Sequence, residues 1–166
     1  GVMGHFAERD GWQRVLADLE ALEAFLREQH PGVPLLLFGH SMGSYLAQAH
    51  LMRHGAGFAA AVLSGSNYQL VALYRLGQLV ARLECLRQGK TGRSALVEAL
   101  TFGSFNRAFR PSRTRYDWLS RDPASVDAYI ADPLCGFRCT NGLWVDLFGG
   151  LQTITPVDAL ARIPHT

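Results

Sequence analysis

Gly39-His40-Ser41-Met42-Gly43 is the stretch that decides the fold of this chain, and it is a G-x-S-x-G pentapeptide. It follows the apolar run 35–38 and precedes a segment with helical spacing. A strand, a sharp turn and a helix in this order are the context of a nucleophile elbow, where glycines on both sides of the serine make room for a strained backbone. The pattern predicts that Ser41 begins a tight turn, with an unusual backbone conformation and an exposed hydroxyl.

The pentapeptide also supplies the groups that acyl transfer requires around a serine. Ser41 is the candidate nucleophile, and the backbone N–H of Met42, at the head of the next helix, is a candidate oxyanion donor. Gly39, His40 and Gly43 complete the elbow. We expect no metal to take part at this site.

A serine hydroxyl is a weak nucleophile until a histidine takes its proton, so the histidines decide whether the site is complete. His40 is adjacent to Ser41, but neighbouring side chains diverge at an elbow, and we interpret it as a packing and hydrogen-bonding residue of the turn. His50 lies about 14 Å along the helix axis at ~1.5 Å per residue, so neither it nor His54 reaches Ser41. His165 is next to last in the chain, where a side chain has little to hold it.

Composition is that of an ordinary globular domain. The 166 residues are 48% hydrophobic and 18% charged, with a net charge of +2, which is enough for one domain with a real core. The densest basic run, 107–115, is broken by Phe109 and Pro111, so nucleic-acid binding is disfavoured. No run approaches the ~18 apolar residues of a membrane span.

The three cysteines favour free thiols over a zinc site. Cys135 and Cys139 are four residues apart with no second pair of cysteines or histidines nearby, and Cys85 is isolated. Buried free thiols suit a reducing compartment, which favours a cytoplasmic location, although the sequence leaves the location open. We expect no cofactor.

The apolar spacing predicts alternating helices and strands over the first 66 residues. A helix from Asp10 to residue 30, with Asp10 as N-cap and Gln13 as its partner, is followed by a strand at 33–38, a helix at 43–54 and a strand at 58–63. Both strands are wholly apolar, which predicts burial on both faces of a parallel sheet. The second helix carries small residues where it would pack on the sheet: Ser44, Ala47 and Ala49.

The next ninety residues have a different character. They predict helices at 70–88, 94–105, 123–131 and 143–153, and an all-helical run of this length is too long for an ordinary crossover. We therefore expect three parts: a core with the elbow at 1–66, a helical cap over the serine at 67–154, and a return toward the core at 155–166. Seven aromatic residues are candidates to line the cap, although plain core packing is the more common role of each: Phe102, Phe105, Phe109, Trp118, Phe137, Trp144 and Phe148.

These motifs together resemble the monoacylglycerol lipase and lysophospholipase group of α/β-hydrolases, within the serine aminopeptidase-like hydrolases. The resemblance covers nearly the whole chain, and three further stretches carry it beside the G-H-S-M-G elbow: Gly4-His5-Phe6, Val62-Leu63-Ser64-Gly65-Ser66, and a cap segment from Phe105 that ends in Asp132-Pro133-Leu134-Cys135-Gly136-Phe137. It implies an α/β class and a partial α/β-hydrolase fold, that is, parallel strands with flanking helices plus a helical cap.

The resemblance implies hydrolysis of lipid-like acyl esters, of the monoacylglycerol or lysophospholipid type, through an acyl-enzyme on Ser41. Met42 matches the second oxyanion donor of the family. The family's acid and base lie beyond Thr166 and its first oxyanion donor lies before Gly1, so we expect an incomplete fragment that is inactive by itself. The cap could also touch a membrane surface transiently, and the oligomeric state stays open.

Two other functions remain open. One is a non-catalytic α/β-hydrolase-like module that binds an apolar ligand under its cap. The other is an acyltransferase or peptidase, because the fold and the elbow select neither the acceptor nor the bond.

Overall fold

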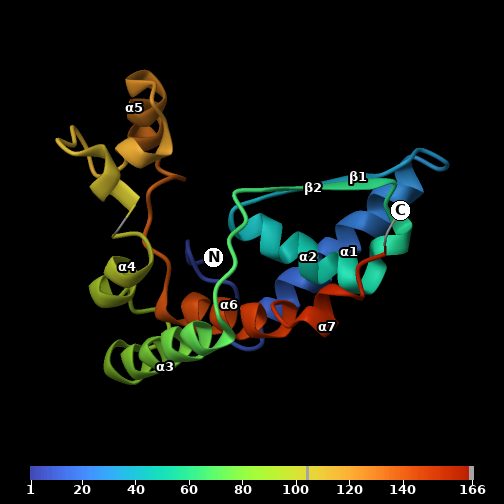
Figure 1. The fold of residues 1–166 in the computed structure, drawn as a ribbon, viewed down its shortest axis with the longest axis horizontal. Helices are drawn as coiled ribbons and strands as arrows, with labels where there is room; N and C mark the ends of the chain where they lie inside the picture. The colour runs from blue at the N-terminus through green and yellow to red at the C-terminus, as the bar shows by residue number, and fades with distance from the viewer. Residues whose placement is uncertain (104, 165–166) are drawn as a thin grey trace.

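The computed structural model describes residues 1–103 and 105–164, and Figure 1 shows the path of the chain. Two parallel strands, β1 (Leu36–His40) and β2 (Ala60–Ser64), pair in register, with Leu36 opposite Ala60 and His40 opposite Ser64. Helix α2 (Met42–His54) and the short 3₁₀ helix η1 (Gly55–Gly57) connect them. The predicted order of strand, helix and strand is confirmed.

The other elements in the described part of the chain are helical and follow the predicted order. They are α1 (Gly11–Gln29), α3 (Val71–Gln88), α4 (Ala95–Thr101), α5 (Pro123–Ala131), α6 (Asn141–Ile154) and α7 (Val157–Leu160), with 3₁₀ helices η2 (Phe105–Phe109) and η3 (Asp117–Leu119). The helix predicted at 94–105 is wrong in its second half. Helix α4 ends at Thr101, and the N–H groups of Phe102 and Gly103 both bind the Glu98 carbonyl oxygen.

Helix α2 covers one face of β1, whereas the other face of the sheet and most of β2 are open. Gly39, on the covered face, is buried against α2, whereas Leu36, Phe38 and Val62 are 74%, 67% and 57% exposed. The prediction that both strands are buried on both faces is therefore wrong for the described residues, because α2 is the helix that packs on them. Both strands also begin two or three residues later than predicted.

The start of α1 differs from the predicted cap. Asp10 has a left-handed backbone, with φ 54° and ψ 39°, and its side chain makes no capping hydrogen bond. The carboxylate of Asp146 on α6 instead lies against the start of α1, where a Cβ added at Gly11 would lie 2.2 Å from Asp146 Oδ2. The residue beside the N-terminus of α1 is thus 135 positions away in the chain, which no local sequence signal could reveal.

The core lies between helices rather than under the sheet. Helix α6 packs along α3 and also contacts α1 and α2, so residues 67–154 contribute to the same apolar cluster as the first helices. The buried members of that cluster are Trp12, Leu16, Leu46, Ala49, Tyr74, Ala81, Val97, Leu143, Trp144, Leu147, Leu151 and Ile154. In Figure 1, α4 and α5 lie to one side, away from the strands.

The last described residues return to α2. Helix α7 contacts both α2 and α6. A Cβ added at Gly55 would lie 2.5 Å from the ring of Pro164. The chain at 155–164 therefore lies beside the C-terminal end of α2, while residues 165 and 166 of the predicted return lie outside the described residues.

Candidate active site

Ser41 lies where β1 ends and α2 begins. Its φ of 51° and ψ of −120° are rare for a residue with a side chain. The residue is exposed, and its backbone N–H donates to the carbonyl oxygen of Ser64 at 2.9 Å. The predicted tight turn and unusual backbone are confirmed, and strain of this kind is concentrated at functional sites.

The two glycines of the elbow differ in their surroundings. A Cβ at Gly39 would lie 2.5 Å from the Gly43 carbonyl oxygen and 2.9 Å from the Ala47 side chain, so the strand can approach the helix only because this residue is glycine. A Cβ at Gly43 would meet nothing within 4 Å in the described structure. The expectation that Gly43 also makes room is wrong here, because its backbone crowds Gly39 while its own side-chain position is open.

His40 binds the neighbouring strand rather than Ser41. Its Nδ1 lies 3.1 Å from Ser64 Oγ. Its ring covers Gly65, where φ is 61° and an added Cβ would lie 3.1 Å from His40 Cε1. The interpretation of His40 as a packing and hydrogen-bonding residue is confirmed.

The head of α2 places backbone N–H groups next to Ser41. Met42 is the first residue of the helix, and the first N–H groups of a helix have no partner within it. They carry the positive end of the helix dipole, so this end of α2 is suited to a developing negative charge.

Two serines support the elbow through hydrogen bonds. The sequence did not identify either of them as a site residue. Ser44 is fully buried and donates its hydroxyl hydrogen to the Ser41 carbonyl oxygen at 2.6 Å. Ser66, after β2, donates in turn to Ser44 Oγ at 2.6 Å. The sequence signal that could have identified Ser44 is a serine, rather than alanine or glycine, at a helix position that faces the sheet.

Three other histidines have structural partners. His50 Nε2 lies 2.7 Å from Glu23 Oε2 and His54 Nε2 lies 3.2 Å from Glu20 Oε1, so both side chains bind α1. His5 Nδ1 lies 2.9 Å from Thr140 Oγ1. His165 lies outside the described residues, and no hydrogen bond between described residues reaches Ser41 Oγ.

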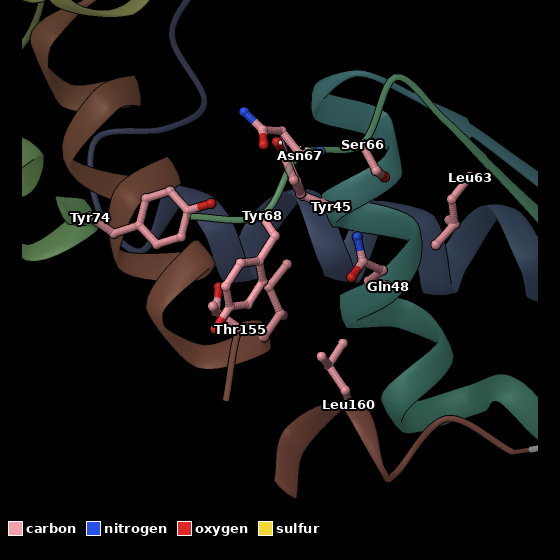
Figure 2. A pocket seen from close by; sticks show the side chains of 10 residues that line it. Tyr45, Gln48, Leu63, Ser66, Asn67, Tyr68, Tyr74, Thr155 and Leu160 are labelled. Carbon is pink, nitrogen blue, oxygen red and sulfur yellow. Dashed lines mark hydrogen bonds between the residues drawn. The ribbon is translucent and has the colours of Figure 1, made fainter. Parts of the chain in front are cut away.

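A cavity of about 250 Å³ lies behind the elbow and is shown in Figure 2. Ser41 does not line it. Its walls come from α2, the end of β2 and the loop after it, and the ends of α3, α6 and α7: Tyr45, Gln48, Leu63, Ser66, Asn67, Tyr68, Tyr74, Ile154, Thr155 and Leu160. Burial raises the pKa of the Tyr74 hydroxyl, so this phenol stays neutral at physiological pH.

The seven candidate aromatic residues are absent from the lining of this cavity. Five of them contact one another in a chain, with ring centroids 4.9–6.2 Å apart: Phe102, Phe105, Trp118, Trp144 and Phe148. Trp144 is buried in the core, whereas Phe102, Phe105, Phe109 and Phe137 remain exposed. The chain of rings therefore joins the core to the exposed part of α4 and η2.

The cysteines are free and half-buried rather than buried, and desolvation raises the pKa of all three thiols. Across residues 1–103 and 105–164, no three histidine, cysteine or carboxylate side chains converge to hold a metal ion. No helix of this part has the length and apolar character needed to cross a bilayer.

Comparison with known proteins gives one family and a similar solved structure. Residues 2–166 match the family described as serine aminopeptidase, S33. A highly thermostable carboxyl esterase from Bacillus coagulans, solved in complex with glycerol, superimposes with a TM-score of 0.78 at 24% sequence identity. The match covers 92% of this chain and 50% of that chain, so the chain spans about half the length of the esterase. No curated protein matches.

This likeness shows the fold, and the elbow and the parallel strands with their flanking helices agree with it. The family match extends over almost every residue. The chain belongs to the serine aminopeptidase, S33 family and has an α/β-hydrolase-like fold.

Proposed function

We propose that the whole protein that carries this chain is a serine carboxylester hydrolase that forms an acyl-enzyme on Ser41. The observation that carries the proposal is the exposed serine with φ 51° and ψ −120° at the head of α2. Backbone strain of this kind costs roughly 1–3 kcal/mol of stability and is concentrated at functional sites. The solved neighbour's description as a carboxyl esterase supports an ester as substrate.

In the proposed reaction, Ser41 Oγ attacks the acyl carbonyl carbon while a base takes the hydroxyl proton. The negative charge that develops on the carbonyl oxygen is stabilised by the Met42 N–H and the helix dipole. Collapse of the intermediate expels the alcohol, which takes the proton from the base, and water activated by the same base then releases the acid. We propose that the histidine and carboxylate of this scheme come from outside residues 1–166, as the resemblance implies.

We propose lipid-like acyl esters as substrates. The segment at 67–154, our proposed lid, exposes apolar side chains along α4 and η2, among them Leu96, Leu100, Phe102 and Phe105. Such a surface suits an acyl chain better than a charged peptide. The family's description names an aminopeptidase, however, so amide substrates form the second arm of the test.

The binding module without catalysis is not favoured. The cavity in Figure 2 is small and is lined by three tyrosines, and Ser41 lies outside it. A ligand held there would give no reason for the strained serine, whereas a nucleophile requires one.

The test compares p-nitrophenyl esters from acetate to palmitate with aminoacyl p-nitroanilides. We expect ester hydrolysis by the whole protein to fall roughly a million-fold in the Ser41→Ala variant. A fluorophosphonate should label the wild-type protein once, on the peptide that contains Ser41. Labelling elsewhere, or ester hydrolysis that survives the substitution, would contradict the proposal, and faster turnover of the anilides would replace the esterase with a peptidase.

We also propose that α3 contacts an anionic membrane surface. Five leucines at spacings of three, three, four and three residues form its outer face, and each is at least half exposed: Leu73, Leu76, Leu79, Leu83 and Leu86. Tyr74 and Ala81 face the core on the opposite side. A helix that exposes an apolar stripe needs a partner or an interface to cover it.

Charge favours lipid over a second copy as that partner. Arg75 and Arg82 lie seven residues apart on one edge of the leucine stripe, and neither forms an ion pair with another described residue. Arg87 lies near the other edge, next to Glu84 at 2.6 Å. Two such helices would bring arginines together, whereas anionic headgroups would neutralise them.

A further inference from the structure

The elbow is held by a relay of three serines. Ser41's carbonyl oxygen accepts two hydrogen bonds from Ser44, one from the hydroxyl at 2.6 Å and one from the backbone N–H at 2.9 Å. Because a carbonyl oxygen can only accept, the Ser44 hydroxyl must donate to it. Ser66 must therefore donate to Ser44 Oγ, so the direction of the relay is fixed from Ser66 through Ser44 to Ser41.

The carbonyl at the end of this relay belongs to the peptide unit between Ser41 and Met42. That unit is planar and trans, so its N–H points opposite to its C=O. The hydroxyl of Ser44 therefore fixes, through one rigid plane, the direction of the Met42 N–H. Hydrogen bonds to the carbonyl also polarise the amide and strengthen its N–H as a donor.

We propose that Ser44 and Ser66 are positioning residues for the oxyanion donor, acting through the peptide that carries the Met42 N–H. The proposal rests on the function proposed above. Ser66 follows β2, whereas Ser44 lies in the first turn of α2. The relay thus ties the peptide next to the nucleophile to the end of the neighbouring strand, and it holds ψ of Ser41 at its strained value of −120°.

The packing at Ser44 supports a role for the hydroxyl itself. The side chain is 0% exposed, and its oxygen both donates and accepts at 2.6 Å. If only side-chain volume mattered at this position, alanine would fit. A buried hydroxyl is stable only when its hydrogen bonds are made, and here they are made to the elbow and the strand end.

The test uses Ser44→Ala and Ser66→Ala in the whole protein with a p-nitrophenyl ester as substrate. We expect kcat to fall about tenfold for Ser44→Ala and about threefold for Ser66→Ala, with KM unchanged, because the oxyanion donor acts in the transition state. The affinity for an alkyl boronic acid, which adds to the serine and mimics the tetrahedral state, should fall by the same factors. The affinity for the acid product should stay constant.

Thr140→Val is the matched control. Thr140 is also 0% exposed, and its hydroxyl oxygen accepts from the Leu143 N–H at 3.2 Å and lies 2.9 Å from His5 Nδ1, so neither of these partners belongs to the elbow. It should lower the thermal midpoint much as Ser44→Ala does, but leave kcat and boronate affinity unchanged. Should Ser44→Ala fail to fold, Ser66→Ala alone carries the test, because Ser66 lies at an exposed position.

The outcomes separate this inference from the proposed function. Unchanged kcat and boronate affinity in both serine variants, together with an inactive Ser41→Ala, would overturn the relay and leave the esterase intact. Activity that survives in Ser41→Ala would overturn both. Equal losses in kcat for Ser44→Ala and Thr140→Val would show that Ser44 has a structural role only.

Discussion

His50 Nε2 on α2 lies 2.7 Å from Glu23 Oε2 on α1, and the imidazole is 2% exposed. Arg27 binds the same carboxylate and also donates to the carbonyl oxygen of Gly57. This contact joins the helix that carries the elbow to the helix before the sheet. His50 thus has a structural partner on the side of α2 that faces α1.

We expect His50→Ala to lower the free energy of unfolding by about 2–4 kcal/mol, because it leaves a cavity and removes a partner of a largely buried carboxylate. His54→Ala is the control. His54 and Glu20 are both more than a third exposed, so its loss should cost less than about 1 kcal/mol. Urea unfolding of the two variants measures the difference, and equal costs would contradict a special role for the buried pair.

Acid should weaken the same contact. Burial raises the pKa of Glu23, but hydrogen bonds from Arg27 and His50 outweigh it and hold that pKa below its ordinary value of 4.5. A lowered pKa means that the stabilisation is present above about pH 4.5 and is lost as the pH falls through the folded-state pKa. Unfolding curves between pH 7 and pH 3 should show wild type and Glu23→Gln converging at the acid end. A difference in unfolding free energy that stays constant with pH would show that the charge of Glu23 does not contribute to stability.

Gly39→Ala should destabilise the elbow. The added methyl group would lie 2.5 Å from the Gly43 carbonyl oxygen, so strand and helix must separate, which we expect to cost about 1–3 kcal/mol. Gly43→Ala places its methyl group in open space and should be neutral or stabilising by up to about 1 kcal/mol. Thermal unfolding of both variants tests the asymmetry, and the reverse order would contradict the close approach at Gly39.

The half-buried carboxylate of Asp146, beside the start of α1, gives a prediction of opposite sign. Desolvation raises the pKa of Asp146, while the hydrogen bond from the Gly11 N–H lowers it by less. The charged form therefore costs stability, and that cost appears as the pH rises from about 3.8 through the raised pKa. Asp146→Asn keeps an acceptor for Gly11 and should be more stable than wild type at pH 7 but not at pH 3. A variant that is less stable at pH 7 would show that the helix dipole outweighs burial.

The leucine stripe of α3 predicts membrane affinity. Leu79→Glu should abolish binding to vesicles that contain phosphatidylglycerol. Arg75→Gln and Arg82→Gln should each weaken binding about fivefold, at about 1 kcal/mol per arginine. Leu22→Glu, at a similarly exposed leucine of α1, is the control and should bind as wild type does.

Vesicle sedimentation measures this affinity. Equal binding by Leu79→Glu and wild type would contradict the proposal. A dimer in analytical ultracentrifugation that Leu79→Glu dissociates would identify a second copy as the partner instead.

The elements and the elbow could be predicted because their signals are local. Apolar spacing gives the helices, and glycines around Ser41 give the turn. Burial of the strands could not be read from their composition, because it depends on which elements cover Phe38 and Val62. The contact of Asp146 with the start of α1 and that of Ser66 with Ser44 bring together distant residues, so neither has a signature in the local sequence.

The hydrogen bond from the Ser41 N–H to the Ser64 carbonyl continues the parallel ladder by one step. The backbone of the nucleophile is therefore part of the sheet, and β2 cannot detach without releasing it. Amide hydrogen exchange at Ser41 should then match the rates at Leu37 and Gly39, whose N–H groups also point toward β2, rather than those of the α2 interior. A local opening that separates the two strands would release the backbone of Ser41 and abolish its activity as a nucleophile while the helical core stays folded.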